Sequence, residues 1–193
     1  QQIINTCTKY PNTVSSSGNT TNQIQIARIL KTYIFSILTD RYGDIPYSAA
    51  LTGATPVPYD KQKDIYYDFF KELKSAKNSF DPNGSAIAGD IVYGGDLSKW
   101  KKLANSLRLI FAMRLSKVDP VKGKTEFLDA LNDVDGLMST NADNFALAFP
   151  GGSFNNPWFG LTGASVVAIS KTMADKLNGY GDPRVFQYGQ KNA

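Results

Sequence analysis

The sequence predicts an all-α protein made of antiparallel helix pairs, joined by long irregular loops and containing at most one short strand. Apolar residues recur at spacings of three and four in several segments of more than ten residues, which is typical of amphipathic helices. Capping residues precede these segments, and Gly or Pro follows them. The two-residue alternation of a strand is confined to one short stretch near the C-terminal end.

Composition favours one packed domain over residues 1–193. The hydrophobic fraction is 42% and the aromatic fraction 12%, as in globular proteins. The 21 basic and 17 acidic side chains leave a net charge of +4 and are scattered, so a nucleic-acid-binding surface is not indicated. No stretch is long and apolar enough for a transmembrane helix.

The composition argues against histidine chemistry, disulfide bonds and metal sites. The sequence contains no histidine, which is the usual proton shuttle and the commonest transition-metal ligand. Cys7 is the single cysteine, so it has no internal disulfide partner, and we expect a buried or free thiol. No loop has the acidic spacing of a calcium site. The sequence therefore predicts neither a bound metal nor a cofactor.

The first long helix is predicted over residues 22–40, after a solvated Ser-, Thr- and Asn-rich loop at residues 11–21. A narrow polar stripe runs along this helix, and apolar residues cover most of its remaining surface. We therefore expect neighbours to cover the helix on more than one side. The stripe consists of Gln25, Arg28, Thr32 and Ser36, and the apolar residues are Ile26, Ile29, Leu30, Tyr33, Ile34, Ile37 and Leu38.

Three more helices are predicted before the C-terminal quarter of the chain. A long loop at residues 42–59 leads to Asp60, which we expect to cap an amphipathic helix ending near residue 80. A third helix is predicted over residues 96–118 and a fourth over residues 121–134. Stacked degenerate pairs of such helices would form a tetratricopeptide-like superhelix.

The C-terminal part has a different character. Alternating Phe and Leu with Ala predicts a short strand at residues 145–149. An aromatic loop rich in Gly and Asn follows at residues 151–163. Ser170 is placed to cap a last helix that extends to Leu177.

Three motifs in this order are similar to those of the SusD/RagB superfamily. The first is DRYGDIPYSAA at residues 40–50, and the second is PYDKQKDIY at residues 58–66. The third is DIVYGGD at residues 90–96, followed by KWKKLANSLR at residues 99–108. The chain thus resembles the SusD-like lipoproteins over residues 22–186, with GDPR at residues 181–184 as a weaker fourth match.

This resemblance implies a tetratricopeptide-like scaffold at the outer-membrane surface of a Gram-negative bacterium. It implies a protein that binds glycan without catalysis and delivers it to a SusC-like TonB-dependent transporter. Family members are longer and begin with a lipidated cysteine, so we expect this chain to be a portion of a lipid-anchored protein.

The Tyr42–Tyr47 motif has a structural and a functional interpretation. Gly43 and Pro46 are typical of a turn that ends a helix, which favours the structural one. Arg114 falls on an apolar helix stripe, so we expect it to bond a carboxylate of the Asp40–Asp44 loop. A glycosidase would instead need two carboxyl groups across a cleft, one with a raised pKa, whereas nearby arginines lower both.

Sugar binding requires aromatic rings beside amide and carboxylate groups. The segment SFNNPWFG at residues 153–160 is the best match, and it supplies four candidate ligand-binding residues. Tyr47 is a fifth and weaker candidate. An equally weighted alternative is that the rings fold onto the helical core. The four residues of the loop are Asn155, Asn156, Trp158 and Phe159.

Two further classes of function remain open at this point. A tetratricopeptide-type scaffold would use the aromatic loop to bind peptide, and a carboxylate-based glycoside hydrolase would cleave its ligand. Trp100 shares a helical register with Leu103, Leu107 and Phe111, which predicts a core position. The Lys99–Lys102 cluster is interpreted as a solvated helix face.

Overall fold

The computed structural model describes residues 1–53, 55–157, 160 and 169–188 of the chain. These residues belong to two compact units, residues 1–147 and residues 148–193. The elements of the first unit are α1 (Gln2–Lys9), α2 (Pro11–Val14), η1 (Ser15–Ser17), α3 (Thr20–Tyr42), α4 (Gln62–Asn78), α5 (Leu97–Arg114), α6 (Pro120–Leu131) and η2 (Asn141–Asp143).

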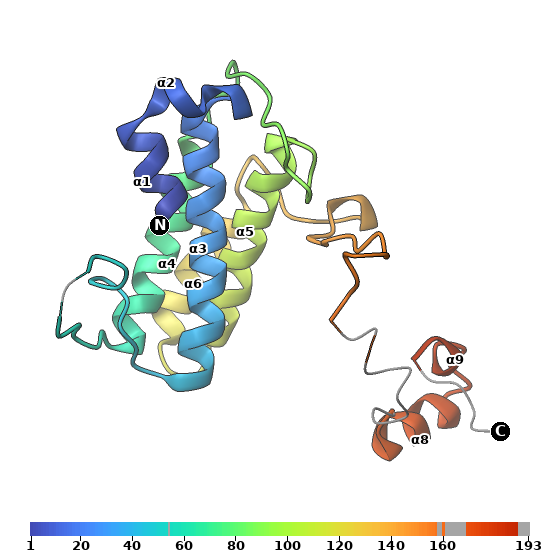
Figure 1. Ribbon diagram of the computed structural model, residues 1–193. Coiled ribbons are helices and arrows are strands. Elements are labelled where there is room, and N and C mark those ends of the chain that lie inside the picture. The colour runs from blue at the N-terminus through green and yellow to red at the C-terminus, as the bar shows by residue number, and fades with distance from the viewer. Residues whose placement is uncertain (54, 158–159, 161–168, 189–193) are drawn as a thin grey trace. The chain divides into compact units, whose positions relative to one another are not determined.

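The first unit is a bundle of side-by-side helices, as the fold prediction required (Figure 1). Helix α3 packs against α1 and α4, and α5 packs against α4 and α6. Described residues outside the helices form only isolated backbone bridges, between Ile45 and Asp60 and between Gly151 and Phe154. The prediction of a mainly helical protein is therefore confirmed, whereas its division into one domain stays a prediction.

The core of this unit is an aromatic cluster between α3, α4 and α5. Phe69 and Phe111 lie with ring centroids 5.4 Å apart, and Tyr66 contacts both rings. Trp100 is 1% exposed, as its helical register predicted, and its indole nitrogen donates to Asp90 at 2.8 Å. Aromatic burial of this kind contributes about 3–5 kcal/mol per ring against truncation to Ala.

Helix boundaries follow the capping residues. Asn19 accepts from the amide of Asn22 and begins α3 two residues before the predicted start. Asp96 caps α5, and Asp119 caps α6. The loop predicted at residues 11–21 is instead largely helical, because the Gln23 amide donates to carbonyls of that segment and fixes two short turns.

The predicted capping role of Asp60 is wrong. Helix α4 begins at Gln62, and Asp44 rather than Asp60 accepts from its amide, at 2.9 Å. The Asp60 carboxylate accepts from the amides of Tyr47 and Ser48, which lie across the loop. Asp60 therefore closes the irregular loop, and Asp44 from the preceding motif caps the helix.

The buried and exposed faces of helix α3 differ from those expected. Its polar residues Thr32 and Ser36 are buried against the bundle, while Ile34, Ile37 and Leu38 are 54%, 47% and 39% exposed. Helices α1, α4 and α5 contact α3, as the prediction of neighbours on more than one side required, but the face with Ile34, Ile37 and Leu38 is uncovered by the described residues. Each buried hydroxyl donates to a carbonyl within its own helix, so burial leaves no unpaired donor.

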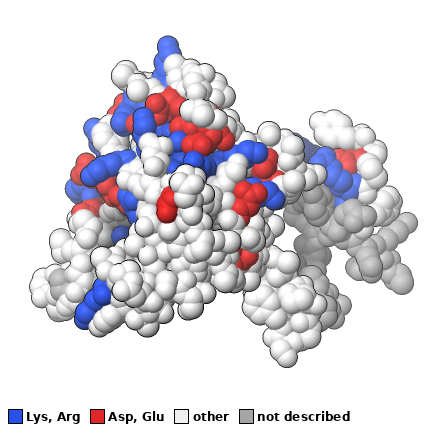
Figure 2. Space-filling view, turned by 90° about the horizontal axis from the view of Figure 1, so that it is seen from above, with Lys and Arg blue, Asp and Glu red and all other residues white. Residues whose placement is uncertain are grey.

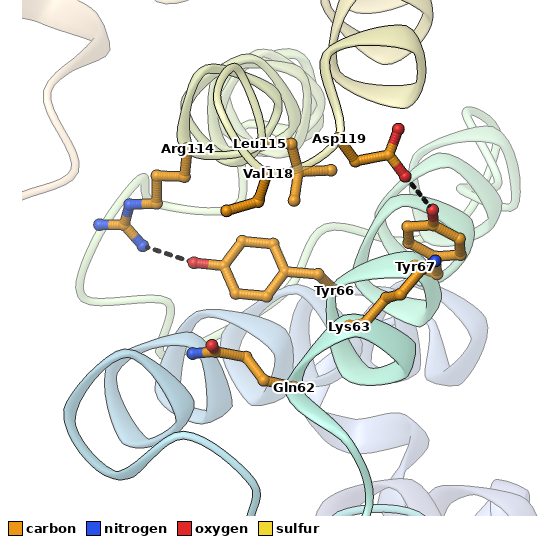
Figure 3. Close-up of a pocket in the computed structure, with 8 residues that line it drawn as sticks. All are labelled: Gln62, Lys63, Tyr66, Tyr67, Arg114, Leu115, Val118 and Asp119. Carbon is orange, nitrogen blue, oxygen red and sulfur yellow. Dashed lines mark hydrogen bonds between the residues drawn. The ribbon is translucent and has the colours of Figure 1, made fainter.

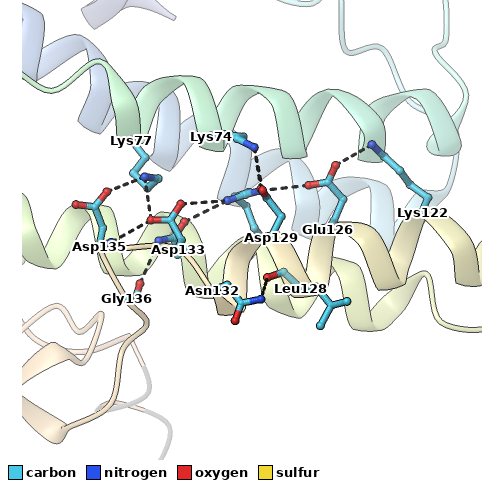
Figure 4. A network of polar contacts seen from close by, with 12 residues as sticks. Lys74, Lys77, Lys122, Glu126, Leu128, Asp129, Asn132, Asp133, Asp135 and Gly136 are labelled. Atoms are coloured by element: carbon cyan, nitrogen blue, oxygen red, sulfur yellow. Dashed lines mark hydrogen bonds and ion pairs between the residues drawn. The ribbon is translucent and has the colours of Figure 1, made fainter.

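A network of ion pairs joins α4, α5 and α6 (Figure 4). Arg108 on α5 is fully buried and bonds the carboxylates of Glu126 and Asp129 on α6. Lys77 on α4, only 4% exposed, contacts Asp133 at 3.1 Å and Asp135 at 2.6 Å. Asp133 and Asp135, in the turn after α6, therefore each pair with a buried cation rather than lying free in solvent.

The Lys99–Lys102 cluster also differs from its interpretation as a solvated face. Lys101 bonds Asp135 at 3.3 Å, and Lys102 bonds Asp143 at 3.1 Å. These pairs fasten the segment that follows α6 to α5.

The predicted strand at residues 145–149 is absent from the structure, which describes all five residues without a strand. Phe145 packs edge-on against Tyr33, with ring centroids 5.4 Å apart, and also contacts Trp100. The alternation of Phe and Leu with Ala therefore does not reflect a sheet ladder: Phe145 contacts the bundle, whereas Leu147 is 41% exposed.

The second unit contains α8 (Lys171–Gly179) and α9 (Val185–Tyr188). Ser170 caps α8 by accepting from the amide of Met173 at 3.3 Å, as predicted. Along the described parts of the chain, no helix combines the length and the apolar character needed to cross a membrane.

Candidate ligand-binding site

The five predicted ligand-binding residues fall into three groups. Asn155 and Asn156 are exposed on one loop of the second unit. Trp158 and Phe159 lie outside the described residues. Tyr47 belongs to the first unit, where it is buried. The structure thus brings the two Asn residues together and describes Tyr47 in a separate setting.

The loop around Asn155 is a tight, hydrogen-bonded turn. Gly151 and Phe154 exchange both backbone hydrogen bonds, at 3.2 and 3.1 Å. Gly152 has a φ of +65°, which suits a glycine, and its carbonyl accepts from the Asn155 side chain at 2.8 Å. Asn155 therefore has a fixed orientation, in which its carboxamide nitrogen bonds the turn and its carboxamide oxygen keeps acceptor capacity.

A stacked aromatic pair accompanies this turn. The rings of Phe149 and Phe154 lie 5.2 Å apart at an interplanar angle of 23°, and Phe154 is 49% exposed. An exposed flat ring beside an amide is the combination that sugar binding requires. Sequence reasoning assigned Phe149 to a strand and did not single it out, because the turn that pairs the two rings is not visible in the residue spacing.

Tyr47 forms part of the wall of a cavity of about 470 Å³ in the first unit. Its ring is 8% exposed and lies edge-on against Phe35 and Phe69. Its hydroxyl donates to Asp68 at 2.7 Å. Burial, reinforced by that carboxylate, raises the pKa of Tyr47 well above its ordinary value.

The cavity beside Tyr47 is predominantly acidic. Asp64, Asp68 and Glu72 follow one another along α4 at intervals of four residues, so all three lie on one helix face. Lys31 supplies the positive charge, 5.7 Å from the centroid of the Tyr47 ring. Carboxylates of this kind can accept hydrogen bonds from sugar hydroxyls, but the faces of the Tyr47 ring have little exposed area for stacking.

The Asp40–Asp44 motif connects the C-terminal end of α3 to α5 and to the start of α4. Arg114 bonds Asp40, as predicted, although its side chain is 46% exposed rather than buried. Asp44 pairs with Lys61 at 2.8 Å, and hydrogen bonds from Lys61 and from the amide of Gln62 lower its pKa. Both carboxylates therefore have cationic partners and do not face each other across a cleft as a catalytic pair would.

The third motif surrounds a partly buried carboxylate. Asp90 accepts from the Trp100 indole at 2.8 Å and from the amides of Val92, Tyr93 and Gly95. Burial alone would raise the pKa of Asp90, but these four hydrogen bonds outweigh burial and lower it. The motif thus anchors the loop before α5, and its own hydrogen bonds occupy the Asp90 carboxylate.

No described group of three or more Cys, Asp or Glu side chains is arranged to hold a metal ion. Cys7 is 3% exposed and donates weakly to Gln23, so it is the buried thiol that was expected. Burial raises its pKa, which makes the thiol less reactive.

Solved structures with the same architecture include two that are named as chitin-binding. A chitin-binding protein is 34% identical and aligns with a TM-score of 0.78, over 95% of this chain and 39% of its own. A SusD homologue from Bacteroides uniformis is 33% identical, with a TM-score of 0.76 over 94% and 38% of the two chains. A chitin-binding SusD homologue from Flavobacterium johnsoniae is 27% identical, with a TM-score of 0.77 over 95% and 38%.

The chain therefore spans about two fifths of the length of these solved chains. No curated protein sequence matches it. A family profile described as "Starch-binding associating with outer membrane" matches residues 1–193 in full. Together with the shared helical architecture and the motifs at residues 40–50, 58–66 and 90–108, this match shows that the chain belongs to the SusD-like family.

Proposed function

We propose that this protein binds oligo- or polysaccharide at the outer-membrane surface and delivers it, unaltered, to a SusC-like TonB-dependent transporter. Glycan binding and outer-membrane association are properties of the family at large. The observation that supports glycan binding in this chain is the Asn155 turn, which presents an ordered amide beside the exposed Phe154 ring. We assign Asn155, Asn156, Trp158 and Phe159 to the glycan site, with Tyr47 as a wall residue of a separate cavity.

The non-catalytic part of the proposal is supported by the electrostatics of the acidic groups. A glycoside hydrolase needs a carboxylic acid whose pKa is raised, so that it remains protonated until it donates. Wherever a carboxyl group in the described parts of the chain has a shifted pKa, the shift is downward. The groups are Asp44, Asp60, Asp90, Asp119, Asp129, Asp133, Asp135, Asp143 and Asp182.

Delivery to a transporter and lipid anchoring are properties of the whole protein, and we propose them from family membership. Two of the similar solved structures are named as chitin-binding. Chito-oligosaccharides are therefore the first ligands to test, and malto-oligosaccharides follow from the family description.

The test is titration calorimetry of the chain with chitotriose, maltotriose and a peptide of mixed sequence, followed by chromatography of each ligand after long incubation. We expect binding of at least one oligosaccharide and recovery of intact ligand. Released shorter sugars would instead make the protein a hydrolase. Binding of the peptide alone would favour a tetratricopeptide-type interaction scaffold.

Site assignment is tested with matched aromatic variants of the second unit. Trp158→Ala and Asn155→Ala should each weaken oligosaccharide binding about tenfold or more, because each removes a ring contact or a hydrogen bond of about 1–2 kcal/mol. Tyr180→Ala removes an aromatic ring that is 85% exposed at the C-terminal end of α8, and this variant should bind like the parent chain. Equal losses in all three variants would contradict the assignment.

A further inference from the structure

A second cavity lies between the N-terminal turn of α4 and the C-terminal end of α5 (Figure 3). Its volume of about 340 Å³ is at the lower end of the range for small-ligand sites, about 300–1,000 Å³. All of its wall comes from the first unit, mostly from two helices of the bundle. It is lined by Gln62, Lys63, Tyr66, Tyr67, Arg114, Leu115, Val118 and Asp119.

The acidic groups around this cavity are already bonded. Asp119 accepts from the Tyr67 hydroxyl and from the amide of Lys122, and these hydrogen bonds lower its pKa. Asp40, at the edge of the cavity, accepts from Arg114 and from the hydroxyl of Tyr66. The carboxylates thus have little remaining capacity to bind a ligand.

The cationic groups keep unused donors. Lys63 has no acceptor within ion-pair distance among the described residues, although its charge helps to lower the pKa of Asp119. Its ammonium group lies 5.4 Å from the centroid of the Tyr67 ring. Arg114 bonds Asp40 and Tyr66 through Nη1 only, which leaves Nε and Nη2 without an acceptor in the described structure. Two cationic donors therefore border the same cavity with capacity for an anionic oxygen.

The remaining wall has an apolar side and one neutral acceptor. Val118 is 79% exposed at the cavity and lies near Leu115. Gln62 donates through Nε2 to the Thr39 carbonyl at 2.7 Å, which fixes the amide and leaves its Oε1 as an acceptor. The hydroxyl groups of a sugar unit could donate to the Gln62 oxygen, and its C–H surface could contact Val118.

We propose that this cavity is a second ligand site, which holds a short acidic oligosaccharide whose carboxylate or sulfate groups bond Lys63 at one end of the cavity and Arg114 at the other (Figure 3). The choice of a sugar rests on the proposed glycan-binding function, and the choice of an acidic one rests on the unused cationic donors. Lys63 and Lys122 occupy the surroundings of the Tyr67 ring, both 5.4 Å from its centroid, so charge rather than ring stacking would select the ligand.

The test uses calorimetric titration of the intact chain with trigalacturonic acid, a sulfated disaccharide and neutral chitotriose. At least one acidic ligand should bind, and the affinity should fall as salt rises from 20 to about 200 mM, because the Debye length shortens. Comparison of the first two ligands distinguishes a carboxylate from a sulfate. If neither acidic ligand binds, the proposal is wrong.

Matched lysine variants locate the binding. Lys63→Met should weaken the acidic ligand about tenfold, whereas Lys117→Met makes the same change at an exposed position outside the cavity and should have no effect. Equal affinities for the two variants would overturn the site. The affinity for chitotriose should be the same in both variants. If only binding of the acidic ligand fails, the second site is wrong and the proposed glycan-binding function stands. If only binding of chitotriose fails, the proposed function is affected and the second site is not.

Discussion

Arg108 shows how a single residue can organise three helices. Its side chain is fully buried, yet it carries a charge that is compensated by Glu126, Asp129 and, at 3.9 Å, Asp133. Its Nε is a buried nitrogen without a hydrogen-bond partner in the described structure. A buried ion cluster of this kind contributes to a unique packing arrangement, because removal of one member leaves the others unpaired.

We predict that Arg108→Ala lowers the free energy of unfolding by about 3–5 kcal/mol, since it leaves a cavity and uncompensated carboxylates. Lys74→Ala is the matched control. Lys74 pairs with the same Asp129, but its side chain is 50% exposed, so about 0–1 kcal/mol is expected. Urea unfolding followed by circular dichroism measures both values, and similar losses for the two variants would contradict a dominant role for burial.

Asp90 gives a prediction of pH dependence. Its pKa is lowered in the folded state, so its stabilising effect is present above the unfolded value of about 3.9 and is lost as pH falls through the lower folded value. Asp90→Asn removes one acceptor oxygen and should cost about 1–3 kcal/mol at pH 7. The difference between variant and parent should shrink below about pH 4. A constant difference from pH 7 to pH 3 in urea titrations would contradict this account.

The positions and partners of single side chains could be predicted from the sequence where helical spacing fixes which face of a helix a residue lies on. The core position of Trp100 follows from helical spacing, and the bond between Arg114 and the Asp40–Asp44 loop follows from a charge on an apolar stripe. The pairing of Lys77 with Asp133 and Asp135 was missed, because their separations of 56 and 58 residues are closed only by the tertiary fold.

At the scale of elements, α3 is the most informative case. The sequence predicted its extent to within two residues but not its orientation. Residues 1–39 include just three charged side chains, Lys9, Arg28 and Lys31, so charge gives little guidance about which face is solvated. Arg28 bonds Glu72 of α4 at 3.0 Å, so the polar stripe faces the bundle, while Ile34 and Ile37 lie on the exposed face.

The consequence is an uncharged apolar surface on α3. Figure 2 shows that Lys, Arg, Asp and Glu gather over part of the molecule and leave a broad area without charge. Ile110 and Met113 of α5, which contacts α3, are also 46% and 55% exposed. Exposed apolar side chains of neighbouring elements promote association in the absence of a covering partner.

We predict that the same substitution, Ile to Ser, changes the free energy of unfolding very differently at two positions of α3. Ile37→Ser should change the free energy of unfolding by less than about 1 kcal/mol and reduce self-association, because Ile37 is 47% exposed. Ile29→Ser is the control at a fully buried position and should cost about 3–5 kcal/mol. Urea unfolding and sedimentation velocity measure the two effects. A large loss of stability at Ile37 would show that a neighbour covers that face.

At the scale of the whole molecule, the predicted glycan site and the helical core are described in different compact units. Every residue of the aromatic core precedes position 146, whereas Asn155 and Asn156 belong to residues 148–193. The architecture was predictable because helical periodicity is local. The site was predictable only as a residue type, since the ring pairing of Phe149 with Phe154 depends on a turn made by two glycines with positive φ.

This division predicts that the two ligand activities can be separated by truncation. A chain of residues 1–147 retains the whole buried core and the ion pairs of Arg108, so it should fold with an unfolding midpoint within a few degrees of that of the intact chain. It should keep the acidic-sugar site between α4 and α5 and lose chito-oligosaccharide binding. Circular dichroism establishes folding before calorimetry measures each ligand. Retention of chitotriose affinity by the folded fragment would move the glycan site away from the Asn155 loop and into the helical unit, where the acidic cavity beside Tyr47 is the alternative location.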